Sequence, residues 1–312
     1  MGGACFAESR KCVLKKAVCL NSSRQRERRK AELIQELRQS HALSYLLVHA
    51  GMARSTFYYH LKQSRKPDKH LEAKKDILRV YHAHHGRMGY RRIKLELRKQ
   101  GRIINHKTVL KLMQELGIKS LVRAKKYRSY KGEQGKVAPN LLNQNFKATL
   151  PDQKWATDIT EFKVTDKKLY LSPIIDLFNG EVISYTMTES PRIKPVVDMV
   201  EQLESRKPED KPVILHSDQG WHYQMLIYQE ALKRKNIIPS MSRKGNCLDN
   251  AVIENFFGTL KCELFYLREY KSISQLKKDI KEYIHYYNHT RIRLNLNGMS
   301  PINYRIHSLN ST

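Results

Sequence analysis

The spacing of apolar residues changes near the middle of the chain. In residues 1–150, apolar side chains recur every three or four positions, as at Ala31, Ile34 and Leu37, which is the spacing of one face of an amphipathic helix. From about residue 150, short apolar runs of strand length alternate with helical stretches. The pattern therefore predicts an all-α first half followed by an α/β second half.

Two pairs of short helices are predicted in the first half. In residues 44–62, one helical stretch ends at a glycine and a second begins around Arg54. This pattern is typical of a helix-turn-helix, and a purely structural helical hairpin would show it as well. The second pair lies within residues 67–122, where Gly101 is a stop signal for one helix and Asn105 a cap for the next.

The second half has the pattern of a mixed sheet flanked by helices. Three strand-like runs, at residues 155–163, 169–178 and 182–188, follow one another with short gaps. Helical stretches and short apolar strands then alternate up to a long helix that begins near Asp249. Antiparallel strands followed by alternating helix and strand predict an α/β fold.

The positive charge is concentrated in the first half. The net charge is +28, of which residues 1–150 carry +25 and residues 151–312 carry +3. Such a polycation repels itself unless a polyanion neutralises it, and nucleic acid is the commonest such partner. The alternative is a solvated basic surface on an unrelated protein. The candidate DNA contacts are Arg54, Arg91, Arg92, Lys107, Lys125 and Lys126.

These patterns predict six segments. They are a disordered, dispensable extension at 1–23, helix-turn-helix-like regions at 24–66 and 67–122, a basic linker at 123–150, an α/β catalytic domain at 151–266 and a C-terminal helical segment at 267–312. In the linker, basic residues interleave with tyrosines, and we expect it to lie along DNA phosphates. The alternative for this segment is a plain solvated linker.

Cysteine usage and hydropathy exclude several protein classes. The five cysteines form no C-x-x-C pair, which argues against a zinc or redox site, and an odd number fits a reducing cytoplasm. The chain has no run of 18 apolar residues, so no membrane span is predicted. Basic residues interrupt any apolar core of a signal peptide. We therefore expect a cytoplasmic protein, associated with the bacterial nucleoid and not with a membrane.

Three acidic residues of the second half lie where α/β proteins place their chemistry. Asp158 falls inside the first strand-like run, where a charge is costly unless a metal or another partner compensates it. Asp218 directly follows a buried strand, and Gly220 permits a sharp turn there. Glu254 lies one turn into the long helix. Each acid alone is most simply a surface residue, so the argument depends on their combination.

Three carboxylates of this kind suit hard divalent cations such as Mg²⁺. Two such ions about 3.5–4 Å apart can activate the attacking oxygen and stabilise the leaving oxygen of a phosphoryl transfer. The acids therefore indicate metal-dependent chemistry on the polyanion that the basic half would bind.

The spacing of the acids resembles that of a known enzyme family. Thirty-five residues separate Asp218 from Glu254, and Lys261 follows seven residues later, two helical turns along the same face. The flanking motifs are W-x-x-D-x-T from Trp155, H-S-D-x-G from His216, D-N-A-x-x-E from Asp249, Y-Y-N-x-x-R from Tyr286 and P-x-x-Y from Pro301, with G-Y-R-R-I and N-H-K-T-V upstream. Over residues 25–305 this combination resembles the integrase-like DDE transposases, most closely the downstream-frame product (OrfB) of the insertion sequence three family.

The resemblance implies a ribonuclease-H-like core in which Asp158, Asp218 and Glu254 hold two Mg²⁺ or Mn²⁺ ions. It implies that Lys261 contacts a DNA phosphate near the site, and the alternative for Lys261 is an ordinary exposed lysine of the helix. His216 and Asn250 are then expected to hold carboxylates or substrate, and the alternative for His216 is an ordinary core histidine. Many relatives have a histidine where this chain has Arg293, so the role of the C-terminal segment does not follow from the match.

The implied activity is cleavage at the ends of an insertion sequence and strand transfer of those ends into new DNA. The implied partners are the terminal inverted repeats, target DNA, an upstream-frame protein (OrfA) that acts as a partner or fusion, and further copies of this chain on DNA. Three alternatives are a DNA-binding regulator, another nuclease of this fold such as a junction resolvase, and an inactive transposase copy. A regulator leaves the acids unexplained, a resolvase does not need so basic a first half, and every matched catalytic position is intact.

Overall fold

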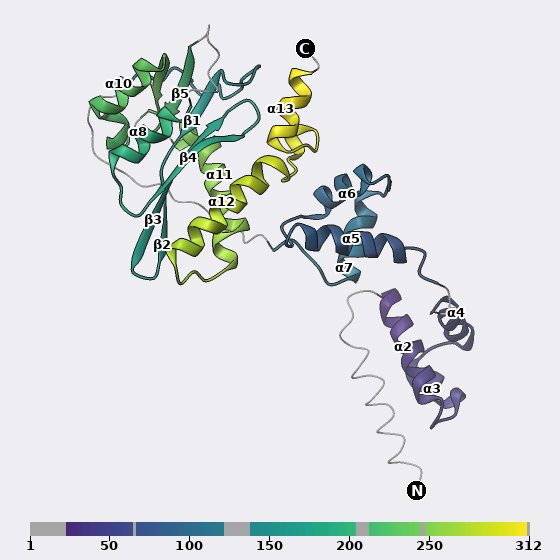
Figure 1. Ribbon diagram of the computed structural model, residues 1–312. Coiled ribbons are helices and arrows are strands. Elements are labelled where there is room, and N and C mark those ends of the chain that lie inside the picture. The colour runs from purple at the N-terminus through teal and green to yellow at the C-terminus, as the bar shows by residue number, and fades with distance from the viewer. Residues whose placement is uncertain (1–22, 65–66, 122–137, 204–211, 244–246, 311–312) are drawn as a thin grey trace. The chain divides into compact units, whose positions relative to one another are not determined.

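The computed structural model describes residues 23–64, 67–121, 138–203, 212–243 and 247–310 (Figure 1). The chain forms two compact units, one that ends at Ala73 and one that begins at Lys74. Most of the expected extension at 1–23 and the basic pair Lys125 and Lys126 lie outside the described residues, and the expectations for them stay predictions.

The first unit is built mainly from three helices: α2 (Ser23–Leu37), α3 (Leu43–Ala50) and α4 (Arg54–Ser64). Its core includes Ile34, Leu46 and Phe57, which are fully buried. Gly51 ends α3 in the left-handed conformation, with φ at +60°, which glycine adopts without steric cost. The expected pair of helices joined by a glycine turn is present, and its role as a DNA-binding helix-turn-helix stays a prediction.

The second unit begins within α5 (Leu71–Ala83), which is followed by α6 (Tyr90–Lys99) and α7 (His106–Glu115). The side chain of Asn105 caps α7 by accepting the Lys107 backbone N–H at 2.9 Å, as the sequence predicted. Helix α5 was not predicted, although Ile77 and Val80 give it a buried face.

The central element is a six-stranded mixed sheet. Its strands are β1 (Lys154–Thr157), β2 (Thr160–Val164), β3 (Lys167–Asp176), β4 (Val182–Thr188), β5 (Val213–Ser217) and β6 (Ile237–Met241). β1 and β2 both pair antiparallel with β3, while β5 and β6 run parallel to β1. The strand expected at 155–163 is therefore interrupted at residues 158–159, and the mixed sheet itself is confirmed.

Helices cover both faces of this sheet (Figure 1). Trp155 and Ile174 of the sheet share one hydrophobic core with α8 (Ile193–Glu201) and α10 (Leu226–Arg234). Residues of the opposite face share a second core with α11 (Ala251–Glu263) and α12 (Ile273–His289). The shorter elements are α9 (Trp221–Gln224), η2 (Cys247–Asn250), η3 (Phe265–Leu267), η4 (Leu294–Leu296) and α13 (Pro301–Leu309). The segment after residue 266 thus contributes to the same core as α11.

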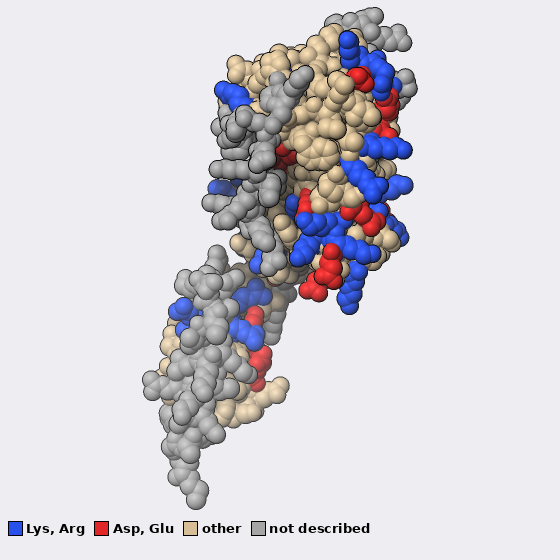
Figure 2. All heavy atoms as spheres, turned by 90° about the vertical axis from the view of Figure 1, so that its left-hand side faces the viewer, with Lys and Arg blue, Asp and Glu red and all other residues tan. Residues whose placement is uncertain are grey.

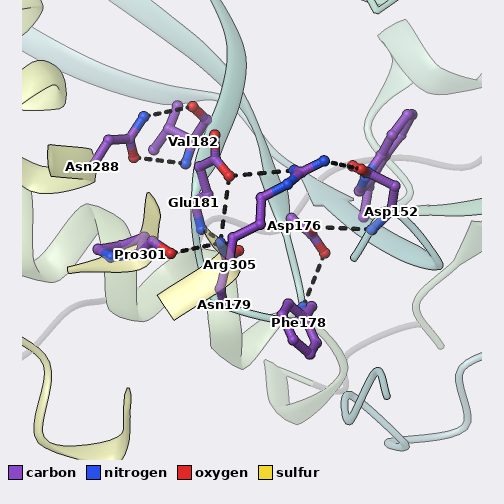
Figure 3. Close-up of polar contacts among 10 residues, drawn as sticks. Asp152, Asp176, Phe178, Asn179, Glu181, Val182, Asn288, Pro301 and Arg305 are labelled. Carbon is purple, nitrogen blue, oxygen red and sulfur yellow. Dashed lines mark hydrogen bonds and ion pairs between the residues drawn. The ribbon is translucent and has the colours of Figure 1, made fainter. Parts of the chain in front are cut away.

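Buried polar contacts join the C-terminal segment to the sheet (Figure 3). Asn288 of α12 bonds to the backbone N–H and carbonyl of Val182 at 3.0 and 2.8 Å, which completes the hydrogen bonding of a strand end. Arg305 of α13 forms ion pairs with two buried carboxylates, Asp152 and Glu181. The Y-Y-N motif and the helix of the P-x-x-Y motif therefore have structural contacts of their own.

Arg293, at the position of the local departure from the family pattern, has structural contacts of its own. Its Nη1 atom donates to the Asn179 carbonyl at 3.2 Å and to the Tyr287 hydroxyl at 3.3 Å. A Cβ atom at Gly180 would meet that Nη1 atom at 1.8 Å, and Gly180 has a positive φ of 74°. Glycine at this position therefore leaves space for the arginine.

Candidate functional site

Asp158 and Asp218 lie at the same edge of the sheet. β1 and β5 are parallel neighbours, with Ala156 opposite His216, and each acid directly follows its strand. Asp158 was predicted to lie in the middle of a strand. It occupies the two-residue break between β1 and β2, because a carboxylate is costly inside a sheet unless it is compensated.

Each of these two carboxylates is held by a backbone N–H close in sequence. Asp158 Oδ1 accepts the Ile159 N–H at 2.7 Å, and Asp218 Oδ1 accepts the Gly220 N–H at 2.8 Å. The φ of Gly220 is an ordinary −59°, so the turn does not require glycine, contrary to expectation. Its hydrogen side chain is needed because a Cβ atom would approach Asp218 Oδ1 to 2.8 Å.

Glu254 and Lys261 come to the same place from α11. Glu254 lies in the first turn of α11, and the buried residues Ile253, Phe257 and Leu260 pack the helix against the sheet. Two turns later, Lys261 places its Nζ 5.3 Å from the centre of the Phe162 ring on β2.

The electrostatics show that these four charged groups influence one another. Burial raises the pKa of Asp158 well above its usual value, and the nearby Asp218 and Glu254 raise it further. Lys261 acts in the opposite sense on Asp158. Burial also raises the pKa of Asp218 and of Glu254. Like charges have thus been brought together with limited compensation, an environment typical of functional sites.

The donor set fits a hard divalent cation in its chemistry. Three carboxylates offer oxygen ligands of the kind that Mg²⁺ prefers, and the backbone bonds of Asp158 and Asp218 each occupy one oxygen of the carboxylate. Within the described residues, no group of three acidic, histidine or cysteine side chains is arranged to hold a metal ion as it stands.

His216 makes the contacts of a core histidine. It is 1% exposed, its Nδ1 lies 2.9 Å from the Ser240 hydroxyl, and its ring meets that of Phe146 edge-on. Burial lowers its pKa, which favours the neutral form. The charge of Asp249 and a hydrogen bond with its backbone act on this pKa in the opposite sense. The expectation that His216 holds a carboxylate or substrate stays a prediction.

The D-N-A-x-x-E motif contains a structural acid that the sequence analysis did not single out. Asp249 is buried and accepts hydrogen bonds from the Arg243 backbone and guanidinium and from Asn140. The hydrogen bond from the Arg243 side chain is the main cause of its lowered pKa. Asp249 therefore fixes the approach to α11. The adjacent Asn250 is also buried, and its Oδ1 has no partner among the described residues.

Tyr223 lies close to Asp158 and Asp218. Its hydroxyl is buried, and Thr157 of β1 lies within hydrogen-bond reach of it. Burial raises its pKa well above the usual value, and Asp158 and Asp218 add to this effect. The proximity of Tyr223 to two acids that follow different strands has no local signal in the sequence.

The expected DNA contacts fall into two kinds. Arg54, Arg91 and Lys107 are exposed on α4, α6 and α7, as a phosphate contact requires. Arg92 instead lies beside Glu263 of α11, with 3.3 Å between Nη1 and Oε1. On the face seen in Figure 2, Lys and Arg side chains lie among Asp and Glu. No helix of the described residues has the length and apolar content to cross a membrane.

Three regions of the chain match known domain families. Residues 148–247 and 254–309 both match integrase core domains, and residues 68–126 match an HTH-like domain. Among solved structures, the catalytic core domain of HTLV-2 integrase in complex with magnesium aligns with 50% of this chain and 97% of its own, at 19% identity and a TM-score of 0.37.

Several curated relatives are insertion-sequence transposases. A putative transposase InsK for insertion sequence element IS150 from Escherichia coli K12 is 55% identical over 88% of this chain and 97% of its own length. The transposase for IS904 from Lactococcus lactis is 35% identical over 76% of this chain and 96% of its own. Transposase InsF for insertion sequence IS3A from E. coli K12 is 36% identical over 69% of this chain and 75% of its own length. Together with the mixed sheet flanked by helices, these matches show that the chain belongs to the insertion sequence three family of transposases, which have an integrase-like core.

Proposed function

We propose that this transposase cuts and joins DNA as a DDE-type enzyme, with Asp158, Asp218 and Glu254 as its catalytic acids. The observation that carries the proposal is their common location. Asp218 and Glu254 are close enough to Asp158 for their charges to raise its pKa, although they come from a different strand and from a helix. Local sequence does not require this convergence, and a DNA-binding regulator has no use for it.

The three acids would hold two Mg²⁺ or Mn²⁺ ions, and the ions would supply activation of the attacking oxygen and stabilisation of the leaving oxygen. The chain positions the reacting DNA beside these carboxylates. Burial lowers the pKa of Lys261, while Glu161 and Asp158 raise it. A cation partly buried beside Asp158 suits a DNA phosphate that enters the site.

The reaction would have two steps, hydrolysis at the end of the element and transfer of the freed strand into the target. Water attacks a phosphodiester at the end of the element, and the bond breaks to leave a 3′ hydroxyl and a 5′ phosphate. The 3′ hydroxyl then attacks a phosphodiester of the target, forms the new phosphodiester bond and releases a target 3′ hydroxyl. Both steps need in-line geometry, which depends on the positions of the three carboxylates.

The partners would be the terminal inverted repeats and target DNA, bound mainly by the first half of the chain. We further propose that the protein acts as an oligomer on DNA, with an upstream-frame protein (OrfA) as partner or fusion, in the cytoplasm at the nucleoid. These proposals rest on the family and on the charge of +25 in residues 1–150.

Metal removal tests the proposed chemistry. Labelled end-repeat DNA is incubated with the protein and Mg²⁺, and parallel samples contain a chelator or Ca²⁺. We expect cleavage and joining with Mg²⁺ alone and DNA binding in all three samples. Cleavage that persists in the chelator, with the protein free of metal by elemental analysis, would contradict the proposal.

A further inference from the structure

A groove of about 690 Å³ lies inside the second unit, between the beginning of α6 and one face of α11. Arg87, Arg91 and Arg92 line one wall. The opposite wall is the face of α11 that carries Glu254 and Cys262. Glu254 therefore belongs both to this wall and to the acids around Asp158, so the groove leads to the proposed active site.

The wall on α11 consists of residues four positions apart, which share a helix face. Glu254, Gly258 and Cys262 have this spacing and line the groove, while Ile253 and Phe257 face the core. A Cβ atom added at Gly258 would meet nothing within 4 Å. The middle of this wall is therefore open space that a ligand could fill.

The two walls are joined at the end of α11. Glu263 is 2% exposed, and its carboxylate accepts two hydrogen bonds from Arg291 at 2.8 Å each and one from the Tyr283 hydroxyl at 2.9 Å. The same carboxylate pairs with Arg92 at 3.3 Å, and Arg87 donates to the Glu263 backbone carbonyl at 3.1 Å. This buried charge network attaches the start of α6 to the catalytic helix.

The charges of the groove favour an anion. Four arginines and two glutamates line it, and the Glu263 carboxylate is already paired with Arg291 and Arg92. Arg91 is exposed and lies against its neighbour Tyr90, whose hydroxyl it contacts at 3.1 Å. Arginine binds phosphate oxygens in a bidentate manner, so Arg91 suits a phosphodiester that enters the groove.

We propose that this groove binds the single DNA strand that carries the scissile phosphate, with Arg91 on a phosphodiester next to the reacting one. A volume of 690 Å³ is within the ~300–1,000 Å³ of small-molecule sites, so it accommodates one or two nucleotides of one strand and not a duplex. The inference deepens the proposed function and rests on it, since Glu254 connects the groove to the chemistry. It also gives α6 a place in the active site in addition to its place in the HTH-like domain.

The native thiol of Cys262 allows a test that needs no catalysis. Cys262 lies alone in the tryptic peptide of residues 262–268 and is a partly exposed free cysteine. Its alkylation by N-ethylmaleimide is followed by mass spectrometry in the full chain, without divalent metal, with and without saturating end-repeat DNA. We expect DNA to slow alkylation at least several-fold. An unchanged rate at saturating DNA overturns the proposal.

Two variants of α6 separate the groove from general charge. Arg91→Glu should abolish the protection of Cys262 and lower cleavage, whereas Arg98→Glu on the same helix should do neither. Arg98 is exposed and does not line the groove, and the two substitutions change the charge equally. Equal behaviour of the two variants contradicts the proposal.

A pair of substitutions at Gly258 tests the groove by volume. Gly258→Ala should fold well, because alanine favours the helix by about 1 kcal/mol over glycine and meets no atom there. Gly258→Leu should lower cleavage about tenfold or more relative to Gly258→Ala, with circular dichroism unchanged.

The groove and the catalytic assignment can fail separately. If DNA protects Cys262 while Glu254→Gln still cuts DNA, the catalytic assignment fails and the groove stands. If Glu254→Gln is inactive and Cys262 is not protected, the groove fails alone.

Discussion

The environments of two buried carboxylates, Asp158 and Asp176, affect their ionisation in different ways. Asp158 and Asp176 are both affected first by burial, which raises the pKa of each. Asp158 faces further acids, which a metal ion would neutralise. Asp176 is fully buried and instead accepts backbone N–H groups from Phe178 and Asp152, both at 3.0 Å (Figure 3). The first environment fits ligand binding, and the second fits a structural role.

Asp176 should make the stability of the protein depend on pH. Burial raises its pKa from 3.8 to about 6, so between these values the folded state binds its proton more tightly than the unfolded state. The free energy of unfolding should therefore fall as pH rises through this window, by about 3 kcal/mol for this group. Urea unfolding at several pH values measures the effect.

Asp176→Asn is the matched control for this prediction. The asparagine cannot titrate, so the free energy of unfolding of the variant should change less between pH 4.5 and 7 than that of the natural protein. It should also be less stable overall, because an amide nitrogen replaces one of the two acceptors for backbone N–H groups. Parallel pH profiles for the two proteins would contradict the assigned pKa.

Helix α11 carries three charged side chains with different environments. It carries Glu254 in its first turn, Lys261 in its last, and the buried Glu263 at its end. Because the helix is packed through Phe257 and Leu260, a displacement at its end would move all three side chains. The ion pairs and hydrogen bonds of Glu263 should therefore help to hold Glu254 in position.

Lys261→Ala should lower activity without abolishing it. The variant keeps the three acids and removes one cation beside the proposed site for the phosphate, so we expect weaker binding of the reacting end and partial cleavage. Lys233→Ala, on the exposed side of α10, is the control and should retain full activity. Complete loss of cleavage in Lys261→Ala, with DNA binding unchanged, would argue for a direct chemical role instead.

Removal of Arg291 should destabilise the second unit strongly. Arg291→Leu leaves the buried Glu263 carboxylate with Arg92 as its remaining ion-pair partner among the described residues, and breaking a buried pair in this way costs about 3–5 kcal/mol. Arg92→Leu removes a longer ion pair of a more exposed side chain and should cost far less. Urea unfolding of the two variants measures the difference, and equal decreases in stability would show that Arg291 is not the main partner.

The sequence predicted elements better than contacts between them. Asp218 was placed correctly because a buried apolar strand ends directly before it. The break at Asp158 was missed because two residues between collinear strands leave the apolar alternation intact. The pairing of Glu263 with Arg291 joins residues 28 positions apart, and no local pattern reports such a contact. The groove beside Glu254 needs two elements that only the folded chain brings together.

At the scale of the whole molecule, charge and chemistry belong to different halves of the chain. Residues 1–150 carry +25 and residues 151–312 carry +3, and the proposed catalytic acids are all in the second half. DNA affinity should therefore depend on basic residues that are far in sequence from the acids. The match of residues 68–126 to an HTH-like domain agrees with this division.

Neutral substitutions should show the division as a salt dependence. In the double variant Arg54→Gln, Lys107→Gln, the steepness of log affinity against log salt concentration should decrease by about one for each DNA phosphate that the variant no longer neutralises. Lys233→Gln in α10 removes an exposed charge from the second half and should leave the slope unchanged. DNA titrations of the full chain at several salt concentrations provide the measurement, and equal slopes for all variants would contradict the division.

The most direct test of the account is Glu254→Gln, assayed for metal-dependent cleavage of labelled end DNA beside a binding titration on the same protein. The amide keeps the shape of the side chain and the packing of α11 and removes one carboxylate ligand. We expect a loss on the order of 3 kcal/mol, at least ~100-fold in the rate of cleavage, with the affinity for DNA and its salt slope unchanged. Cleavage by Glu254→Gln at a rate near that of the natural protein would contradict the account.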